Sequence, residues 1–211
     1  MDKKYQIFIS STYMDLKEVR SIAFTSILEM GHIPIGLDIF QVSDDYSTEK
    51  YVSKYIDSSQ LIVVIIGDRY GSIAQSGKSF VEEEYLYALT KNKRIMFFVN
   101  SKYRQNDDPN YQKFVRKIME NNLVVLCDNP IDFKMKLVSN ISQVLAKNPP
   151  STYWAKTSSA VDIDNNDYLG NLRTLLSSNA DDENVDILGL MLHNIKEIGE
   201  FNILKKEQQK K

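Results

Sequence analysis

The feature that most constrains the fold is an alternation, from Tyr5 to Ala146, of short apolar runs with longer amphipathic segments. Apolar runs of this length predict strands buried on both faces, and the amphipathic segments predict helices that cover a parallel sheet. We expect strands over Tyr5–Ser10, His32–Ile35, Leu61–Ile66, Arg94–Val99 and Leu123–Cys127. We expect helices over Asp15–Met30, Thr48–Ser58, Phe80–Lys91, Tyr111–Glu120 and Ile131–Ala146. The pattern predicts an α/β protein with a flavodoxin-like, five-stranded parallel open sheet and helices on both of its faces.

The regular alternation stops at Asn148-Pro149-Pro150, because two prolines end a helix and restrict the residue before them. We predict an α/β domain over residues 1–147, a linker over 148–165 and a C-terminal helical extension over 166–211. In the linker, Trp154 is expected to fold back on the main domain as an anchor.

Two helices are expected in the extension, over Asp167–Leu176 and Val185–Leu204. The second carries an apolar stripe at helical spacing, formed by Leu188, Met191, Leu192, Ile195 and Ile198. Such a stripe must be covered. We therefore expect the extension to dock on the main domain, or to assemble the chain into a homo-oligomer or with a partner protein.

Composition narrows the classes of function. Lys+Arg 26 against Asp+Glu 28 gives a formal net charge of −2, which disfavours nucleic-acid binding. The longest apolar run, Leu61 to Gly67, is too short to span a bilayer, and a strand is expected close behind Met1, so we expect no membrane association and a cytoplasmic location. With one cysteine, Cys127, and two histidines, neither a disulfide nor a metal cluster is expected.

The segment from Ser79 to Ala88 places a carboxylate on the apolar stripe of a predicted helix. Ser79 and Glu82 have the spacing of a capping box, which gives Glu82 a structural role. Glu84 shares a helix face with Val81 and Ala88 and has no cation three or four positions away. Glu84 therefore faces a site or a distant partner, and we take it as the candidate catalytic residue.

Hydroxyl side chains lead from the first predicted strand into the first predicted helix, at Ser10, Ser11 and Thr12. Hydroxyls and free N–H groups at a helix N-terminus predict a seat for phosphate, whereas the simpler interpretation is a helix cap. Arg20 lies at the edge of the apolar stripe of that helix. It requires a partner, which is either an internal acid such as Glu84 or a ligand phosphate.

Two further loops supply candidate binding residues. Arg69 and Tyr70 lie between Gly67 and Gly71 directly after the most apolar strand, where a tight loop could present a cation and an aromatic plane to a nucleotide. The alternative is an ordinary turn. Asp38 follows the second strand, where a carboxylate could accept hydrogen bonds from ribose hydroxyls.

Several of these segments together resemble a known family. Phe8-Ile9-Ser10-Ser11-Thr12 with Asp15-Leu16 and Arg20, then Arg69-Tyr70-Gly71, and then Ser79 through Tyr85 are similar to a bacterial and eukaryotic domain family of formally unknown function. That family is regarded as TIR-like and often lies at the N-terminus of NTPase-containing signalling or defence proteins. The resemblance covers roughly Met1 to Ala146 and implies a TIR-like fold.

The resemblance also implies a role for Glu84. Members of the wider TIR and nucleoside deoxyribosyltransferase superfamily carry a catalytic glutamate on the helix after the third strand, four residues before a small residue. Glu84 and Ala88 match that arrangement. The implied activity is that of a hydrolase that cleaves the N-glycosidic bond of NAD or a related nucleotide. A role in anti-phage defence signalling is part of the same implication.

One carboxylate suffices for this chemistry, because nicotinamide leaves as a neutral pyridine and needs no acid. NAD would then be the substrate, with no cofactor and no metal. Two alternatives stay open: a TIR-like protein interaction module without catalysis, and a nucleoside deoxyribosyltransferase that uses Glu84 as its nucleophile.

Overall fold

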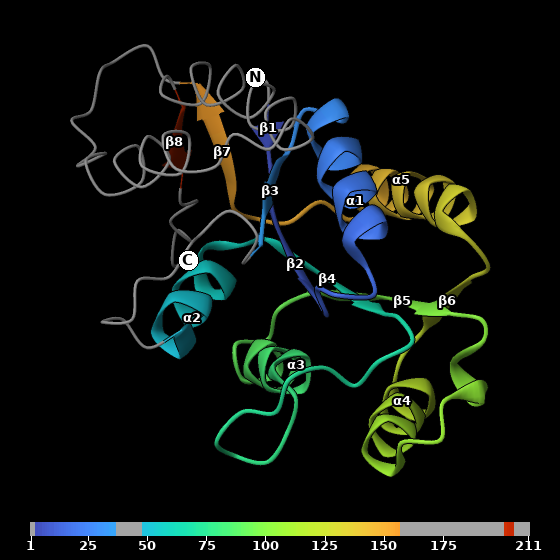
Figure 1. Cartoon of the computed structure of the whole chain (residues 1–211). Helices are drawn as coiled ribbons and strands as arrows, with labels where there is room; N and C mark the ends of the chain where they lie inside the picture. The colour runs from blue at the N-terminus through green and yellow to red at the C-terminus, as the bar shows by residue number, and fades with distance from the viewer. Residues whose placement is uncertain (1–2, 37–47, 157–200, 205–211) are drawn as a thin grey trace, which may run out of the picture.

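A five-stranded parallel sheet forms the centre of the computed structural model, which describes residues 3–36, 48–156 and 201–204 (Figure 1). Its strands are β2 (Gln6–Ser11), β3 (Ile33–Ile35), β4 (Leu61–Ile66), β5 (Ile95–Asn100) and β6 (Val124–Cys127). They lie in the order β3-β2-β4-β5-β6. The chain adds β3 on one side of β2 and then adds β4, β5 and β6 on the other side, so the strand order reverses between β2 and β4. This is the flavodoxin-like order. The predicted strands and the fold class are confirmed, with strand ends shifted by at most one residue.

Helices cover both faces of the sheet (Figure 1). On one face lie α1 (Lys17–Glu29) and α5 (Pro130–Lys147), and on the other lie α2 (Thr48–Ser58), α3 (Phe80–Thr90) and α4 (Pro109–Asn121). All five predicted helices are present. The molecule is therefore a three-layer α/β structure with a hydrophobic core on each side of the sheet.

The central strand β4 shows why the sheet requires helices on both sides. All its residues are buried, and they alternate between the two cores: Val63 contributes to the core under α1 and α5, whereas Ile62 and Val64 contribute to the core under α2, α3 and α4. The same alternation runs along β2, where Ile9 faces α1 and Phe8 faces α3. Whether a side chain at the end of β2 faces α1 or α3 therefore follows from whether its residue number is odd or even.

Caps fix where the helices begin. The Asp108 carboxylate accepts hydrogen bonds from the N–H groups of Asn110 and Tyr111, and the Asn129 side chain accepts one from the N–H of Asp132. A proline follows each cap at the first helical position, where it lacks only an N–H that would be unpaired. For this reason α4 and α5 begin slightly before the predicted residues. A short 3-10 helix, Tyr103–Gln105, precedes α4.

A second, antiparallel sheet joins both ends of the described chain. It has the order β1-β7-β8, formed by β1 (Lys3–Lys4), β7 (Tyr153–Lys156) and β8 (Phe201–Leu204). The predicted linker over 148–165 therefore contains the strand β7, and the predicted helix Val185–Leu204 is wrong for the residues of β8. Trp154 packs against the core on the α2, α3 and α4 side, as expected for an anchor.

The rest of the predicted extension, including Asp167–Leu176 and the apolar stripe of Leu188–Ile198, lies outside the described residues. Within the part of the chain that the structure describes, none of the helices has the length and apolar character needed to cross a membrane.

Candidate functional site

The centre of the candidate site is a contact between the end of β2 and the middle of α3. Ser10 follows the alternation of β2 and points to the α3 face, and Glu84 lies on the buried side of α3 with Val81 and Ala88. The Ser10 hydroxyl donates a hydrogen bond of 2.5 Å to Glu84 Oε2. Both side chains are buried, and Glu84 is only 7% exposed. The carboxylate therefore faces an internal partner.

Burial raises the pKa of the Glu84 carboxyl group from 4.5 to about 7. Desolvation, which disfavours the charged form, is the largest cause. The hydrogen bond from Ser10 and the positive charge of Arg20 act in the opposite direction, and the charge of Glu83 adds a small increase. Near neutral pH this group therefore exchanges between its acid and its carboxylate forms.

Arg20 brings a positive charge from α1 to the same end of the sheet. Its guanidinium is buried, and Nη1 donates to the carbonyl oxygen of Ser11 at 3.1 Å and to the Ser11 hydroxyl. A Cβ added at Gly36 would lie 3.3 Å from Nη2 of Arg20, so the absence of a side chain at the end of β3 leaves room for the guanidinium. Arg20 thus lies at the carboxyl ends of β2 and β3, and its charge acts on Glu84.

Tyr70, on the loop between β4 and α3, is not exposed, contrary to the prediction. Its side chain is only 8% exposed, its ring meets Phe114 edge-on at 6.2 Å, and its hydroxyl donates a 2.6 Å hydrogen bond to Glu82 Oε2. Tyr70 therefore presents no open aromatic plane. The Ser79 hydroxyl does accept the N–H of Glu82, at 3.2 Å, but the Glu82 carboxylate is taken by Tyr70 instead of completing the predicted capping box.

The remaining predicted binding residues are Thr12, Arg69 and Asp38, of which the structure describes the first two. Thr12 lies against the neighbouring loop, where a Cβ added at Gly71 would come within 2.8 Å of Cγ2 of Thr12; Gly71 also has a φ of +95°, which disfavours other residues. Arg69 is exposed on the same loop. Asp38 lies outside the described residues. The structure thus brings together Ser10, Ser11, Arg20 and Glu84, with Thr12 and Arg69 on the loops beside them.

A second polar cluster, at the end of β4, was not predicted as a site. Asp15 Oδ2 accepts the N–H of Asp68 at 3.0 Å, and Asp68 Oδ1 accepts a hydrogen bond from the side chain of Asn100 at 2.8 Å. A Cβ added at Gly67 would lie 2.5 Å from Asp15 Oδ2, so this close approach requires glycine. The sequence signal was a polar residue at or shortly after the carboxyl end of each of three neighbouring strands, β2, β4 and β5. Because Asp15 holds the loop, α1 begins at Lys17, later than predicted.

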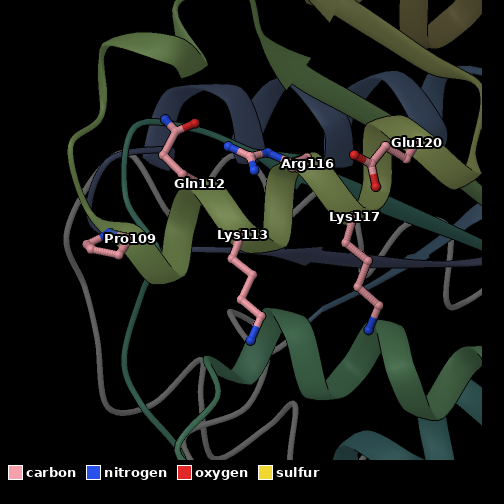
Figure 2. Close-up of a pocket in the computed structure, with 6 residues that line it drawn as sticks. All are labelled: Pro109, Gln112, Lys113, Arg116, Lys117 and Glu120. Atoms are coloured by element: carbon pink, nitrogen blue, oxygen red, sulfur yellow. The ribbon is translucent and has the colours of Figure 1, made fainter.

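The described residues contain no group of three or more histidine, cysteine, aspartate and glutamate side chains placed to hold a metal ion. A hollow of ≈ 510 Å³ lies elsewhere, on the outer surface of α4. Figure 2 shows its six lining side chains projecting from that one helix: Pro109, Gln112, Lys113, Arg116, Lys117 and Glu120. It shares no residue with the Glu84 cluster.

Comparisons with known proteins give one family and distant structural neighbours. The model of a family described as "Domain of unknown function (DUF4062)" matches residues 6–142. No curated protein matches the chain. Among solved structures, the TIR domains of the activated Roq1 resistosome that directly recognises the pathogen effector XopQ are 15% identical, with a TM-score of 0.41, over 91% of this chain and 99% of that one.

A putative quinone reductase from Klebsiella pneumoniae is 8% identical, also with a TM-score of 0.41, over 70% of this chain and 87% of that one. At such scores the fold assignment rests on the strand order and register of the chain itself.

Proposed function

Since the chain belongs to the family described as a domain of unknown function (DUF4062), we propose from its geometry that it is a TIR-like domain that cleaves the N-glycosidic bond of NAD or a related nucleotide at Glu84. The observation that supports this most is the buried Glu84 carboxyl group, held by Ser10 beside Arg20 at the carboxyl end of β2. That end of β2 borders the point where the strand order reverses, which is where open α/β sheets bind their ligands.

The chemistry requires one carboxylate close to the ribose. As the bond to nicotinamide breaks, positive charge develops on the ribose ring, and a nearby carboxylate stabilises it. Nicotinamide leaves as a neutral molecule, so no acid is needed. The hydrogen bond from Ser10 and the charge of Arg20 favour the ionised form of Glu84 that this step uses.

The neighbouring groups suit the anionic part of such a substrate. Arg20 on α1, Ser11 at the end of β2 and Thr12 on the loop that follows would pair a pyrophosphate with a cation and hydroxyl donors. Arg69 adds an exposed cation on the adjacent loop. In this proposal NAD is a substrate, and the protein requires no cofactor.

The low exposure of Glu84 gives the proposal a second part, which is regulation. A ribose can reach Glu84 only if the Ser10–Glu84 contact or a flanking loop moves. We assign this opening to assembly with a second copy or with a partner protein, as befits a signalling domain, and expect the residues from 166 onward to contribute. Activity should then rise steeply with protein concentration.

The test is the release of nicotinamide from NAD by the purified full-length chain, at low and high protein concentrations. Glu84→Gln keeps the shape of the side chain and should abolish release. The matched control is Glu83→Gln, which changes the adjacent acid on the same helix and should retain release. Equal release by wild type and Glu84→Gln, or none at any concentration, would overturn the catalytic assignment.

One observation favours a second candidate, an interaction module without catalysis. Exposed apolar side chains occur directly before β6, the edge strand of the main sheet, on β6 itself and on α5, and Leu123 among them is 97% exposed. We call this set the edge patch: Leu123, Leu126, Ile131 and Met135. Several exposed apolar side chains on neighbouring elements favour a protein contact surface. If Ile131→Asp abolished association while Glu84→Gln had no effect in any assay, the module would be the better description.

A further inference from the structure

The loop between β2 and α1 presents an exposed aromatic side chain beside the Glu84 cluster. Tyr13 is 54% exposed, although it follows Ser11 by only two residues, and Ser11 binds Arg20. The ammonium group of Lys17 lies 5.1 Å from the centre of the Tyr13 ring. One face of the ring therefore meets a cation, and the tyrosine is not part of either core.

Other exposed apolar side chains occur on the same pair of loops. Met14 follows Tyr13, and Ile73 lies on the loop between β4 and α3; both are exposed. The two loops come together where Thr12 lies against Gly71. They follow the neighbouring strands β2 and β4, so exposed apolar and aromatic side chains lie at the edge of the sheet where ligands of this fold bind.

Tyr13 can supply the exposed aromatic ring that Tyr70 does not provide. Among the described residues of these two loops, Tyr13 and Tyr70 are the aromatic ones, and Tyr70 is buried and bonded to Glu82. An exposed tyrosine ring with a lysine over it combines a surface for stacking a flat base with a charge for a phosphate. That combination matches a nucleoside phosphate better than it matches a sugar or a peptide.

We propose that Tyr13 and Lys17 form an outer subsite that binds a nucleoside phosphate, with the base stacked on Tyr13 and the phosphate paired with Lys17. This inference rests on the proposed function, because the outer subsite would hold the adenosine phosphate half of the dinucleotide whose other half reaches Glu84. It makes Tyr13 the residue that distinguishes a dinucleotide from a mononucleotide.

The test measures the binding of ADP to the full-length protein by isothermal titration calorimetry. ADP carries the base and the phosphates but has no bond to nicotinamide, so binding is scored independently of cleavage. Loss of one base–aromatic stack corresponds to a roughly 5- to 150-fold weaker affinity, which is the expected effect of Tyr13→Ala. Tyr13→Phe should restore affinity, and Lys17→Ala should weaken the binding of ADP more than that of adenosine.

A second tyrosine–lysine pair serves as a control. Lys91 lies 5.1 Å from the ring of Tyr87, with the same spacing in the chain as Lys17 and Tyr13, but near the end of α3 that leads into β5, and Tyr87 is partly buried against the core and donates to Asp57. Tyr87→Ala should leave the affinity for ADP unchanged.

Two results would overturn the outer subsite: no ADP binding by the wild type at millimolar concentrations, or equal affinities for Tyr13→Ala and wild type. If ADP binds through Tyr13 but no nicotinamide is released, the subsite stands and the proposed cleavage fails. If nicotinamide is released while Tyr13→Ala binds ADP as the wild type does, the cleavage stands and the subsite fails.

Discussion

Glu84 should make the stability of this protein fall as the pH rises. Its pKa is raised from 4.5 to about 7 by burial, so the folded chain binds a proton that the unfolded chain has already released. Between these two pH values the native state holds more protons than the unfolded state, and the free energy of unfolding decreases with pH. Below pH 4.5 the carboxyl group is protonated in both states. Its favourable contribution is therefore complete there and lost as the pH rises through 7.

The size of the effect follows from the two pKa values. Each pKa unit corresponds to about 1.4 kcal/mol, so the difference between 4.5 and about 7 gives a loss of about 3 kcal/mol once the pH exceeds both. Glu84→Gln removes the ionisation and keeps a side chain that Ser10 can still donate to. The variant should therefore gain about 3 kcal/mol relative to wild type between pH 4 and pH 8.

Urea unfolding followed by far-UV circular dichroism at several pH values measures this difference directly. Subtracting the curve of the variant from that of the wild type cancels the contributions of the titrating groups that do not interact with Glu84. Glu120→Gln is the control for the substitution itself, because it removes an exposed acid from α4, away from the Glu84 cluster.

If the wild type and Glu84→Gln curves stay parallel within about 1 kcal/mol from pH 4 to pH 8, the pKa of Glu84 is not raised. The argument that burial dominates over Ser10 and Arg20 would then be wrong. A carbon-13 NMR titration of the Glu84 carboxyl group gives the same answer without unfolding.

Two further substitutions test contacts away from Glu84. Tyr70→Phe removes the 2.6 Å hydrogen bond to Glu82 and should lower the free energy of unfolding by about 1.5 kcal/mol in urea titrations; an unchanged value would mean that this bond does not fix the loop. Lys136→Met removes the 2.8 Å hydrogen bond that Lys136 donates to the Leu126 carbonyl on the edge of β6, and should increase self-association in sedimentation velocity. Lys134→Met on the same helix should not increase self-association. Equal sedimentation of the two variants would contradict the role of Lys136.

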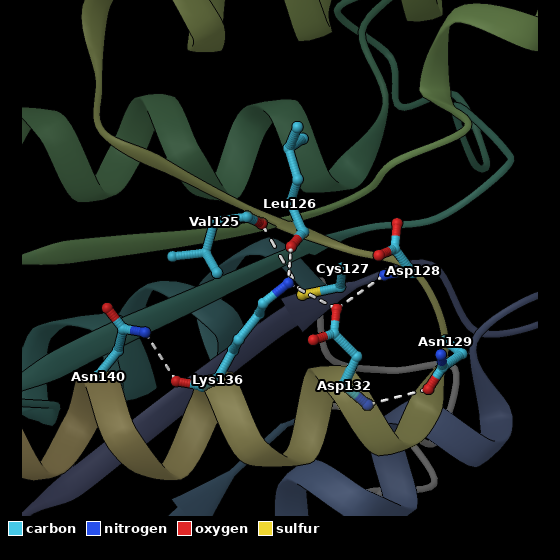
Figure 3. A network of polar contacts seen from close by, with 8 residues as sticks. All are labelled: Val125, Leu126, Cys127, Asp128, Asn129, Asp132, Lys136 and Asn140. Atoms are coloured by element: carbon cyan, nitrogen blue, oxygen red, sulfur yellow. Dashed lines mark hydrogen bonds and ion pairs between the residues drawn. The ribbon is translucent and has the colours of Figure 1, made fainter.

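The role of Lys136 follows from the alternation of carbonyl directions along β6. The Cys127 carbonyl accepts the N–H of Ser101, at the end of β5, so the carbonyl of Leu126 points away from the sheet. Figure 3 shows Lys136 reaching this carbonyl from α5 while its ammonium group also meets Asp132, at 2.7 Å. A lysine held against an outward carbonyl of an edge strand hinders pairing of that strand with another chain. The edge patch is therefore suited to contact through side chains, without added strands.

The sheet and its helices were predictable because they rest on local patterns. Leu61–Ile66 is apolar at every position and has the length of a strand, which favours a strand covered on both sides. The position of Glu84 on the apolar stripe of α3 predicts either a site or a distant internal partner, and the structure shows the internal partner. Its partner Ser10 is 74 positions away, and Arg20 was recognised from its own stripe as a side chain that requires a partner.

Contacts that depend on competition between partners were not predictable. The Ser79 to Glu82 spacing indicates a capping box, but the hydroxyl of Tyr70 binds the Glu82 carboxylate instead. Likewise, β7 pairs with the charged residues Lys3 and Lys4, and neither segment has the apolar pattern of a strand. In both cases the contact is made between separate segments of the chain, so no local sequence pattern predicts it.

The pKa of Glu84 links the proposed substrate to the state of the site. In the protein alone the carboxyl group is partly protonated at neutral pH, because desolvation outweighs the effects of Ser10 and Arg20. A substrate with a cationic ring would bring a second positive charge close to Glu84 and favour its ionised form. A neutral nucleoside would bring none. In the proposed reaction, binding of the pyridinium nucleotide would therefore generate the carboxylate that cleaves it, and the neutral product would return the group towards its protonated form as it leaves.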